Sequence, residues 1–249
     1  MNKEHEMRSL MAEWGGCERC PMLVESRQQQ VFGSGALYAK PGPIALVGEA
    51  PGATEDGSDR AIPFIGAAGQ ILMEALLNLH LHDPRFADLY PSKVGQPLNF
   101  VELREMLHER FWFTNLCLCR PEDNRDPTTF EMKECWPRLA AELYIVDPVI
   151  VVALGRTAFQ FLTKSRKGIG NARGALYRVE VPGKVLTTIE YPVLPTHHPA
   201  YVDRIQDFDE PKGIAKSWFD DLAKTLSFVD TLNNLTSGTE VPNRDIERS

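Results

Sequence analysis

Four short apolar runs, each ending in a turn, set the pattern of this chain. The runs cover residues 44–47, 111–116, 149–154 and 191–196. Short apolar runs that are bounded by turn residues are typical of buried strands. Segments with apolar residues at helical spacing lie between the runs, so strands and helices alternate along the chain. This alternation predicts an α/β fold with a parallel sheet covered by helices on both faces.

The same spacing predicts where the helices lie. We expect helices at about 1–14, 67–80, 100–109, 128–146, 156–163 and 212–229. A β-hairpin is expected at 179–191, and residues 22–42 are expected to be a linking segment. We expect a single domain over residues 1–230 with a surface insertion at 82–110. The segment 231–249, rich in Asn, Thr, Ser and Glu, is expected to be a disordered tail.

Composition narrows the class of protein. The chain has 249 residues, of which 43% are hydrophobic, so it can bury a sizeable core. No run approaches the roughly 20 apolar residues of a membrane span, and the charged first 14 residues lack a signal-peptide core. We therefore expect a cytoplasmic monomer with no membrane partner. The formal charge of −7 argues against nucleic-acid binding over the whole surface, but it allows a local basic patch.

Four of the five cysteines have a spacing that favours a metal site. Cys17 and Cys20 form a CxxC turn, whereas Cys119 and Cys135 lie in a predicted loop and on the helix after it. In a cytoplasmic chain such residues are metal ligands or core residues more often than disulfides. Four thiolates can hold a zinc ion or a four-iron cluster, and the spacing does not decide between them. Cys117 is left over and is expected to be buried.

Polar side chains follow the ends of the predicted strands. Glu49, Asn115, Arg156 and His198 stand just beyond successive strands, whose ends meet at one edge of a parallel sheet. The amide of Asn115 can read the edge of a base, and His198 can donate to an oxygen that gains negative charge. The candidates for orienting water or offsetting a cationic sugar are Glu49, Glu55 and Asp56. Each of these side chains also has a purely structural interpretation.

Two further stretches suit a nucleic-acid ligand. Pro63-Phe64 places an aromatic ring just before a predicted helix, where the ring can stack on a flat ligand such as a nucleobase. Residues 164–178 hold five basic side chains and three glycines. This basic loop can bind phosphates, and a solvated loop is the alternative.

Together these residues resemble the family 4 uracil-DNA glycosylases, the iron–sulfur branch of the uracil-DNA glycosylase superfamily. The resemblance runs from about Cys17 to Arg204. Six segments carry it, in this order: CERCP, VGEAPGATED, PFIGAAGQIL, TNLCLCRPEDNRDPTTFEMKEC, DPVIVVALGRTA and LPTHHPA. The family's fold implies a three-layer α/β/α sandwich with a central four-stranded parallel sheet.

The resemblance also implies roles for particular residues. It places a structural [4Fe–4S] cluster, for which zinc is the alternative, on Cys17, Cys20, Cys119 and Cys135. The catalytic residues that it implies are Glu49, Glu55 and His198. The base-binding residues are Phe64, which stacks, Asn115, which reads the base, and Gly48 and Ala50 in the turn. The residues assigned to DNA binding are Arg156, Lys167, Arg173, Pro199, Ala200 and Tyr201.

The implied reaction is hydrolysis of the N-glycosidic bond of an everted base, uracil first, to leave an abasic site in DNA. No covalent intermediate is expected, because residues 164–174 contain no His. The sequence departs from the family in a longer loop before Phe64 and in Ala50, where other uracil enzymes place an Asp. We therefore keep two alternatives: excision of a bulky modified base, such as a modified cytosine in phage DNA, and an iron–sulfur nucleic-acid-binding protein without catalysis.

Overall fold

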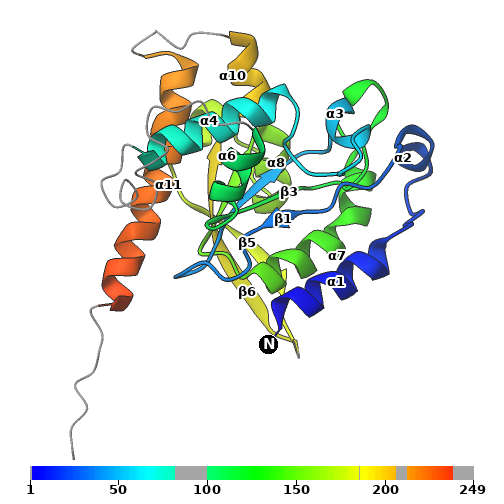
Figure 1. Cartoon of the computed structure of the whole chain (residues 1–249), viewed down its shortest axis with the longest axis horizontal. Helices are drawn as coiled ribbons and strands as arrows, with labels where there is room; N and C mark the ends of the chain where they lie inside the picture. Colours follow the sequence, from blue (N-terminus) through cyan, green and yellow to red (C-terminus); the bar gives the residue numbers. More distant parts are fainter. Residues whose placement is uncertain (1, 82–99, 185, 206–211, 238–249) are drawn as a thin grey trace, which may run out of the picture.

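The computed structural model describes residues 2–81, 100–184, 186–205 and 212–237. At its centre is a six-stranded sheet with the order β1-β3-β2-β4-β6-β5 (Figure 1). The strands are β1 (Ser34–Gly35), β2 (Ile44–Gly48), β3 (Phe111–Asn115), β4 (Ile150–Leu154), β5 (Tyr177–Pro182) and β6 (Thr188–Thr196). The four strands predicted from the apolar runs are β2, β3, β4 and β6, and they pair in parallel.

The sheet is wider than predicted because an antiparallel strand lies at each edge. The short strand β1 pairs with β3, and β5 pairs with β6 as the two arms of the expected hairpin. The two residues of β1 carry no hydrophobic pattern, so the segment reads as a link in the sequence. The prediction of a parallel four-stranded centre is confirmed, and the two edge strands are added to it.

Helices cover both faces of the sheet. They are α1 (Lys3–Trp14), α2 (Pro21–Ser26), α3 (Ala53–Asp56), α4 (Ala67–Leu81), α6 (Phe100–Leu107), α7 (Thr129–Val146), α8 (Arg156–Thr163), α9 (Ile169–Ala172), α10 (Pro199–Ile205) and α11 (Ile214–Ser237). Successive residues of a strand face opposite ways. Ala45 and Val47 of β2 therefore pack with α1, α7 and α8, whereas Ile44 and Leu46 pack with α4 and α11. This arrangement is the predicted three-layer sandwich.

Two predicted boundaries need correction. The closing helix α11 continues to Ser237, eight residues past its expected end and into the segment expected to be a disordered tail. The buried residues Leu222, Leu226 and Val229 keep helical spacing up to residue 229, and the helix then continues through the polar residues that follow. Residues 238–249 of the expected tail lie outside the described residues.

The insertion expected at 82–110 is also more than a surface excursion. Residues 82–99 lie outside the described part of the chain, but α6 packs against α4 and contributes to the core. Leu107 and Arg104 of α6 are buried. Within the described residues, no helix is long and apolar enough to cross a membrane.

Candidate functional site

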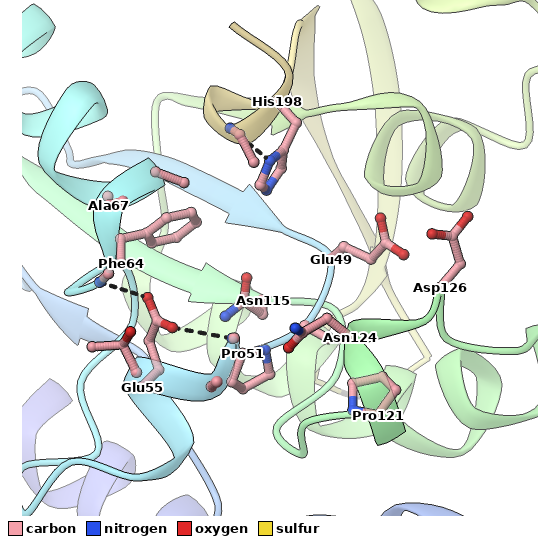
Figure 2. A pocket seen from close by; sticks show the side chains of 18 of the residues that line it. Glu49, Pro51, Glu55, Phe64, Ala67, Asn115, Pro121, Asn124, Asp126 and His198 are labelled. Carbon is pink, nitrogen blue, oxygen red and sulfur yellow. Dashed lines mark hydrogen bonds between the residues drawn. The ribbon is translucent and has the colours of Figure 1, made fainter. Parts of the chain in front are cut away.

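A cavity of about 460 Å³ opens beyond the carboxyl ends of the parallel strands. The loop after β2, the loop before α4, the end of β3, the loop before α7 and the start of α10 all contribute to its wall (Figure 2). Of the residues expected to be catalytic or base-binding, those that line the cavity are Glu49, Ala50, Glu55, Phe64, Asn115 and His198. Segments that are far apart in sequence thus meet around a single space.

Gly48 lies directly behind the cavity wall, between Phe64 and Asn115. A Cβ atom at this position would stand 2.3 Å from Oδ1 of Asn115 and 2.8 Å from Cζ of Phe64. Only glycine therefore allows the aromatic ring and the amide to come together here. Both side chains are almost fully buried, with 6% of Phe64 and 4% of Asn115 exposed.

The backbone of Asn115 is fixed by Arg138, a side chain with no exposed surface. Its guanidinium donates from Nη2 to the carbonyl oxygens of Asn115 and Leu116, both at 2.8 Å. Nη1 donates to Glu142 Oε2 at 2.5 Å and forms a buried ion pair within α7. Trp112 Nε1 donates to the other oxygen of Glu142 at 2.6 Å. The end of β3 is thereby tied to the middle of α7.

His198 is neutral at pH 7. Burial, and then the positive charge of Arg204, lower the pKa of this imidazole from 6.5 to about 4. The backbone N–H of Ala200 donates to His198 Nδ1 at 3.2 Å, so Nδ1 is the unprotonated nitrogen. The proton of the neutral ring is consequently on Nε2. The site thus holds an imidazole N–H donor that carries no charge.

Glu49 faces a second carboxyl group, that of Asp126, at the edge of the cavity (Figure 2). Burial, and then the charge of Asp126 and a hydrogen bond with it, raise the pKa of Glu49 from 4.5 to about 7. A hydrogen bond from Thr157 and the charge of Arg156 act in the opposite direction. Glu49 can therefore gain or lose a proton near neutral pH.

The other carboxylates of the first loop hold backbone. Glu55 Oε2 accepts from the N–H of Gly52 at 3.1 Å, and Oε1 accepts from the N–H of Gly66 at 3.0 Å. Glu55 therefore joins the two halves of the loop that carries Phe64, an arrangement that favours positioning over the activation of water. Asp56 is fully buried and accepts from the N–H groups of Gln28 and Gln29, away from the cavity.

The residues expected to bind DNA differ in their exposure and in their contacts. Arg156, Lys167 and Tyr201 are exposed, while Pro199 is buried and Ala200 lines the cavity. Arg173 needs correction, because its Nε donates to the buried carboxylate of Asp221 at 2.9 Å and its Nη2 to the carbonyl of Ser217. Asp221 also accepts from the hydroxyl of Thr196 at 2.8 Å. Arg173 thus holds α11 to the end of β6 and is not a free phosphate ligand.

The four cysteines with metal-like spacing line one small cavity beside α2, together with apolar side chains such as Trp14 and Leu23. Burial, and then the charges of Cys135, Cys119 and Cys17, raise the pKa of Cys20 to about 12. The negative charges of neighbouring thiolates repel one another, and a shared cation would offset that repulsion. Among the described residues, no three His, Cys, Asp or Glu side chains are already placed as a metal site. Cys117 is fully buried, as expected.

Two polar residues of the cavity wall, Asp126 and Arg204, were not predicted from the sequence. Asp126 lies in a polar loop in which every residue has a surface interpretation, and Arg204 stands six residues after His198 on α10. No periodicity singles out either residue. The only available signal was position, because each follows closely on a segment that ends a parallel strand.

Comparison with known proteins shows matches over most of the chain. A model of the uracil DNA glycosylase superfamily matches residues 37–221. A type-4 uracil-DNA glycosylase of Pyrobaculum aerophilum is 32% identical over 76% of this chain and 80% of its own length. Another, from Thermotoga maritima, is 31% identical over 86% of this chain and 89% of its own length. A type-5 enzyme of Pyrobaculum aerophilum is 30% identical over 74% of this chain and 78% of its own length.

The buried ion pair behind Asn115 gives a stability prediction. Glu142→Gln leaves the Arg138 charge buried without a counterion, so we expect the free energy of unfolding to fall by about 3–5 kcal/mol. The matched control is Glu180→Gln, which breaks the exposed pair between Glu180 and Lys164, where we expect a loss below about 1 kcal/mol. Urea unfolding measures both losses, and equal losses would contradict the assignment.

Proposed function

The chain belongs to the uracil-DNA glycosylase superfamily and to its type-4 members, and we propose that it excises uracil from DNA by hydrolysing the N-glycosidic bond. The observation that carries this proposal is the meeting of Phe64, Asn115 and His198 around one cavity (Figure 2). A volume of about 460 Å³ lies within the usual range of small-ligand sites, so the cavity has room for an everted nucleotide.

The base side of the cavity suits a leaving group that becomes an anion. Phe64 stacks on the ring, and the Asn115 amide donates to one uracil oxygen while accepting from the ring N–H. As the bond between C1′ and N1 breaks, its electron pair moves onto the base and raises the charge on the other oxygen. The Nε2–H of His198 donates to that oxygen without bringing a full positive charge.

The sugar side needs a group that orients water and accepts its proton. The Glu49–Asp126 pair lines the cavity, and its ionised form accepts that proton as the water oxygen bonds to C1′. The products are a free base and an abasic sugar. We assign this role to the pair in preference to Glu55, because both oxygens of Glu55 hold backbone N–H groups.

The DNA backbone is proposed to run across the mouth of the cavity. Arg204 lines the cavity and is exposed, so it can bind the phosphate next to the everted nucleotide. Arg156 and Lys167 extend this positive surface, and Tyr201 offers an exposed ring beside the duplex. Local cations on an acidic chain would then guide DNA to a single face.

The cysteine cavity is proposed to hold a [4Fe–4S] cluster on Cys17, Cys20, Cys119 and Cys135. Support comes from the chemistry of the donor set, four thiols among apolar side chains, which is the usual ligand set of such clusters. Bound there, the cluster would join α2 to α7 and supply structural cross-linking. No step of the proposed reaction passes through it, because the cysteines and the base-binding residues line separate cavities.

A larger modified base is a second candidate substrate. The wall before and within the first turn of α4 consists of Gly66, Ala67, Ala68 and Gly69, so no bulky side chain from this stretch enters the cavity. The same oligonucleotide assay tests this candidate when modified cytosines are included among the bases.

The first functional prediction concerns base release. We expect the protein to release free uracil from a uracil-containing oligonucleotide. Asn115→Ala should lower kcat/KM by about 10- to 100-fold, because this is the usual contribution of a bidentate contact to a base. Asn78→Ala, at an exposed position of α4 outside the cavity, is the matched control and should keep full activity. Absence of base release by the unaltered protein would refute the proposed function.

A second prediction concerns pH. A pKa of about 7 means that Glu49 is half ionised at pH 7, so kcat should rise with pH, with its midpoint near 7, and level off about one pH unit higher. The pKa of His198, about 4, is too low to add a step in this range. Asp126→Asn removes the neighbouring charge while Glu49 stays buried, so we expect the acid limb to move to lower pH.

Asp123→Asn is the matched control for the pH profile. It makes the same change in the same loop but outside the cavity wall, and the limb should remain near pH 7. A limb that Asp126→Asn leaves in place would contradict the assignment of the carboxyl pair.

The cofactor proposal predicts a brown protein with about four irons per chain. Cys119→Ala should remove the absorbance near 400 nm and most of the iron. Cys117→Ala, two residues away, should retain both, because this thiol lies outside the cysteine cavity. A colourless protein with stoichiometric zinc would identify the alternative metal.

A further inference from the structure

Helix α6 brings a buried arginine to the loop that carries Phe64. Arg104 is 5% exposed, and its Nη1 donates to the carbonyl oxygen of Pro63 at 2.6 Å. Nη2 donates to Ser34 Oγ at 2.8 Å. The guanidinium lies 5.3 Å from the centre of the Phe113 ring, which in turn lies 6.2 Å from the Phe64 ring. Arg104 thus contacts both the backbone before Phe64 and an aromatic neighbour of its ring.

The loop before α4 requires such support, because its backbone is strained. Ala61 has a φ of 45° and Phe64 a φ of 59°, both in the left-handed region that residues other than Gly rarely adopt. Conformations of this kind persist where the surrounding structure determines them. The hydrogen bond to Pro63 acts on the peptide that directly precedes Phe64, so it fixes the backbone next to one of the two strained residues.

Other contacts hold the loop from the opposite side. Gly69 packs so closely on Phe64 that a Cβ atom there would stand 1.9 Å from the Phe64 carbonyl oxygen. Glu55 accepts from the N–H of Gly66, and its negative charge also acts on Arg104. The loop that carries Phe64 is therefore held by the close approach of α4, by Glu55 and by Arg104.

We propose that Arg104 is a positioning residue that fixes the Phe64 ring for stacking on the everted base. The inference rests on the proposed function, since it assigns a purpose to the ring that the loop holds. It also gives a role to α6, which belongs to the segment that the sequence analysis treated as an insertion. Arginine suits this position because its planar fork carries two separate donors and a flat face for Phe113, whereas lysine ends in a single point charge.

A double-mutant cycle tests whether Arg104 acts through Phe64. We expect Arg104→Met to lower kcat/KM for uracil release by about tenfold through misplacement of the ring. In a Phe64→Ala background the same change should have less than about a twofold effect, because coupled residues are not additive. Arg104→Lys should recover part of the loss. Effects that simply multiply in the double variant would overturn the proposal.

The matched control is Arg110→Met, which removes a second, largely buried guanidinium that is held by a charged hydrogen bond. Arg110 donates to Asp230 at 2.8 Å, at the amino end of β3 and far from the cavity. We expect this variant to lose stability but to keep kcat/KM. An equal loss of activity in both variants would mean that Arg104 supports the fold only, and would also overturn the proposal.

Hydrogen exchange separates this inference from the proposed function. Arg104→Met should speed amide exchange across residues 61–66 about tenfold, and Arg110→Met should leave this stretch unchanged. The measurement needs no activity. If the unaltered protein releases no base, the proposed function fails. The exchange rates still decide whether Arg104 holds the loop, and unchanged rates in Arg104→Met would show that it does not.

Discussion

The site depends above all on one buried guanidinium, that of Arg138. Arg138 is entirely buried, and burial of an unpaired charge is among the most costly events in folding. The cost is offset because its donors meet Glu142, Thr114 and the carbonyl oxygens at the end of β3. The chain leaves the sheet at this point. A single side chain thus solves the problem of ending a buried strand and sets the direction in which Asn115 points.

The same solution recurs at two further segments that reach the cavity. Arg104 holds the loop of Phe64, and Arg173 reaches the end of β6, just before His198, through Asp221 and Thr196. Three arginines from three different helices or loops therefore stand behind the three residues proposed to contact the base. Pockets at strand ends are built from loops, and loops lack the repeated hydrogen bonds of helices and sheets. Charged hydrogen bonds to carbonyls and carboxylates replace that rigidity.

The sequence predicted the parallel centre of the sheet because buried strands give strong local signals. Residues 149–154 are apolar throughout, and the Thr128 and Glu131 capping box marks the start of α7. It also predicted that Glu49, Asn115 and His198 share one edge, because this follows from the order of parallel strands. Arg104, Arg138 and Asp126 could not be found in this way. Their roles come from contacts with residues 20 or more positions away, except for the pair within α7, and no local pattern encodes such contacts.

Helix α7 has one more consequence. Cys135, Arg138 and Glu142 follow one another at intervals of three and four residues, so they occupy a single stripe of one stiff rod. The thiol cavity lies at one end of that stripe and the amide of Asn115 beside its middle. A change in packing around Cys135 would therefore reach Asn115 through α7, because Arg138 on the same stripe donates to the Asn115 carbonyl oxygen.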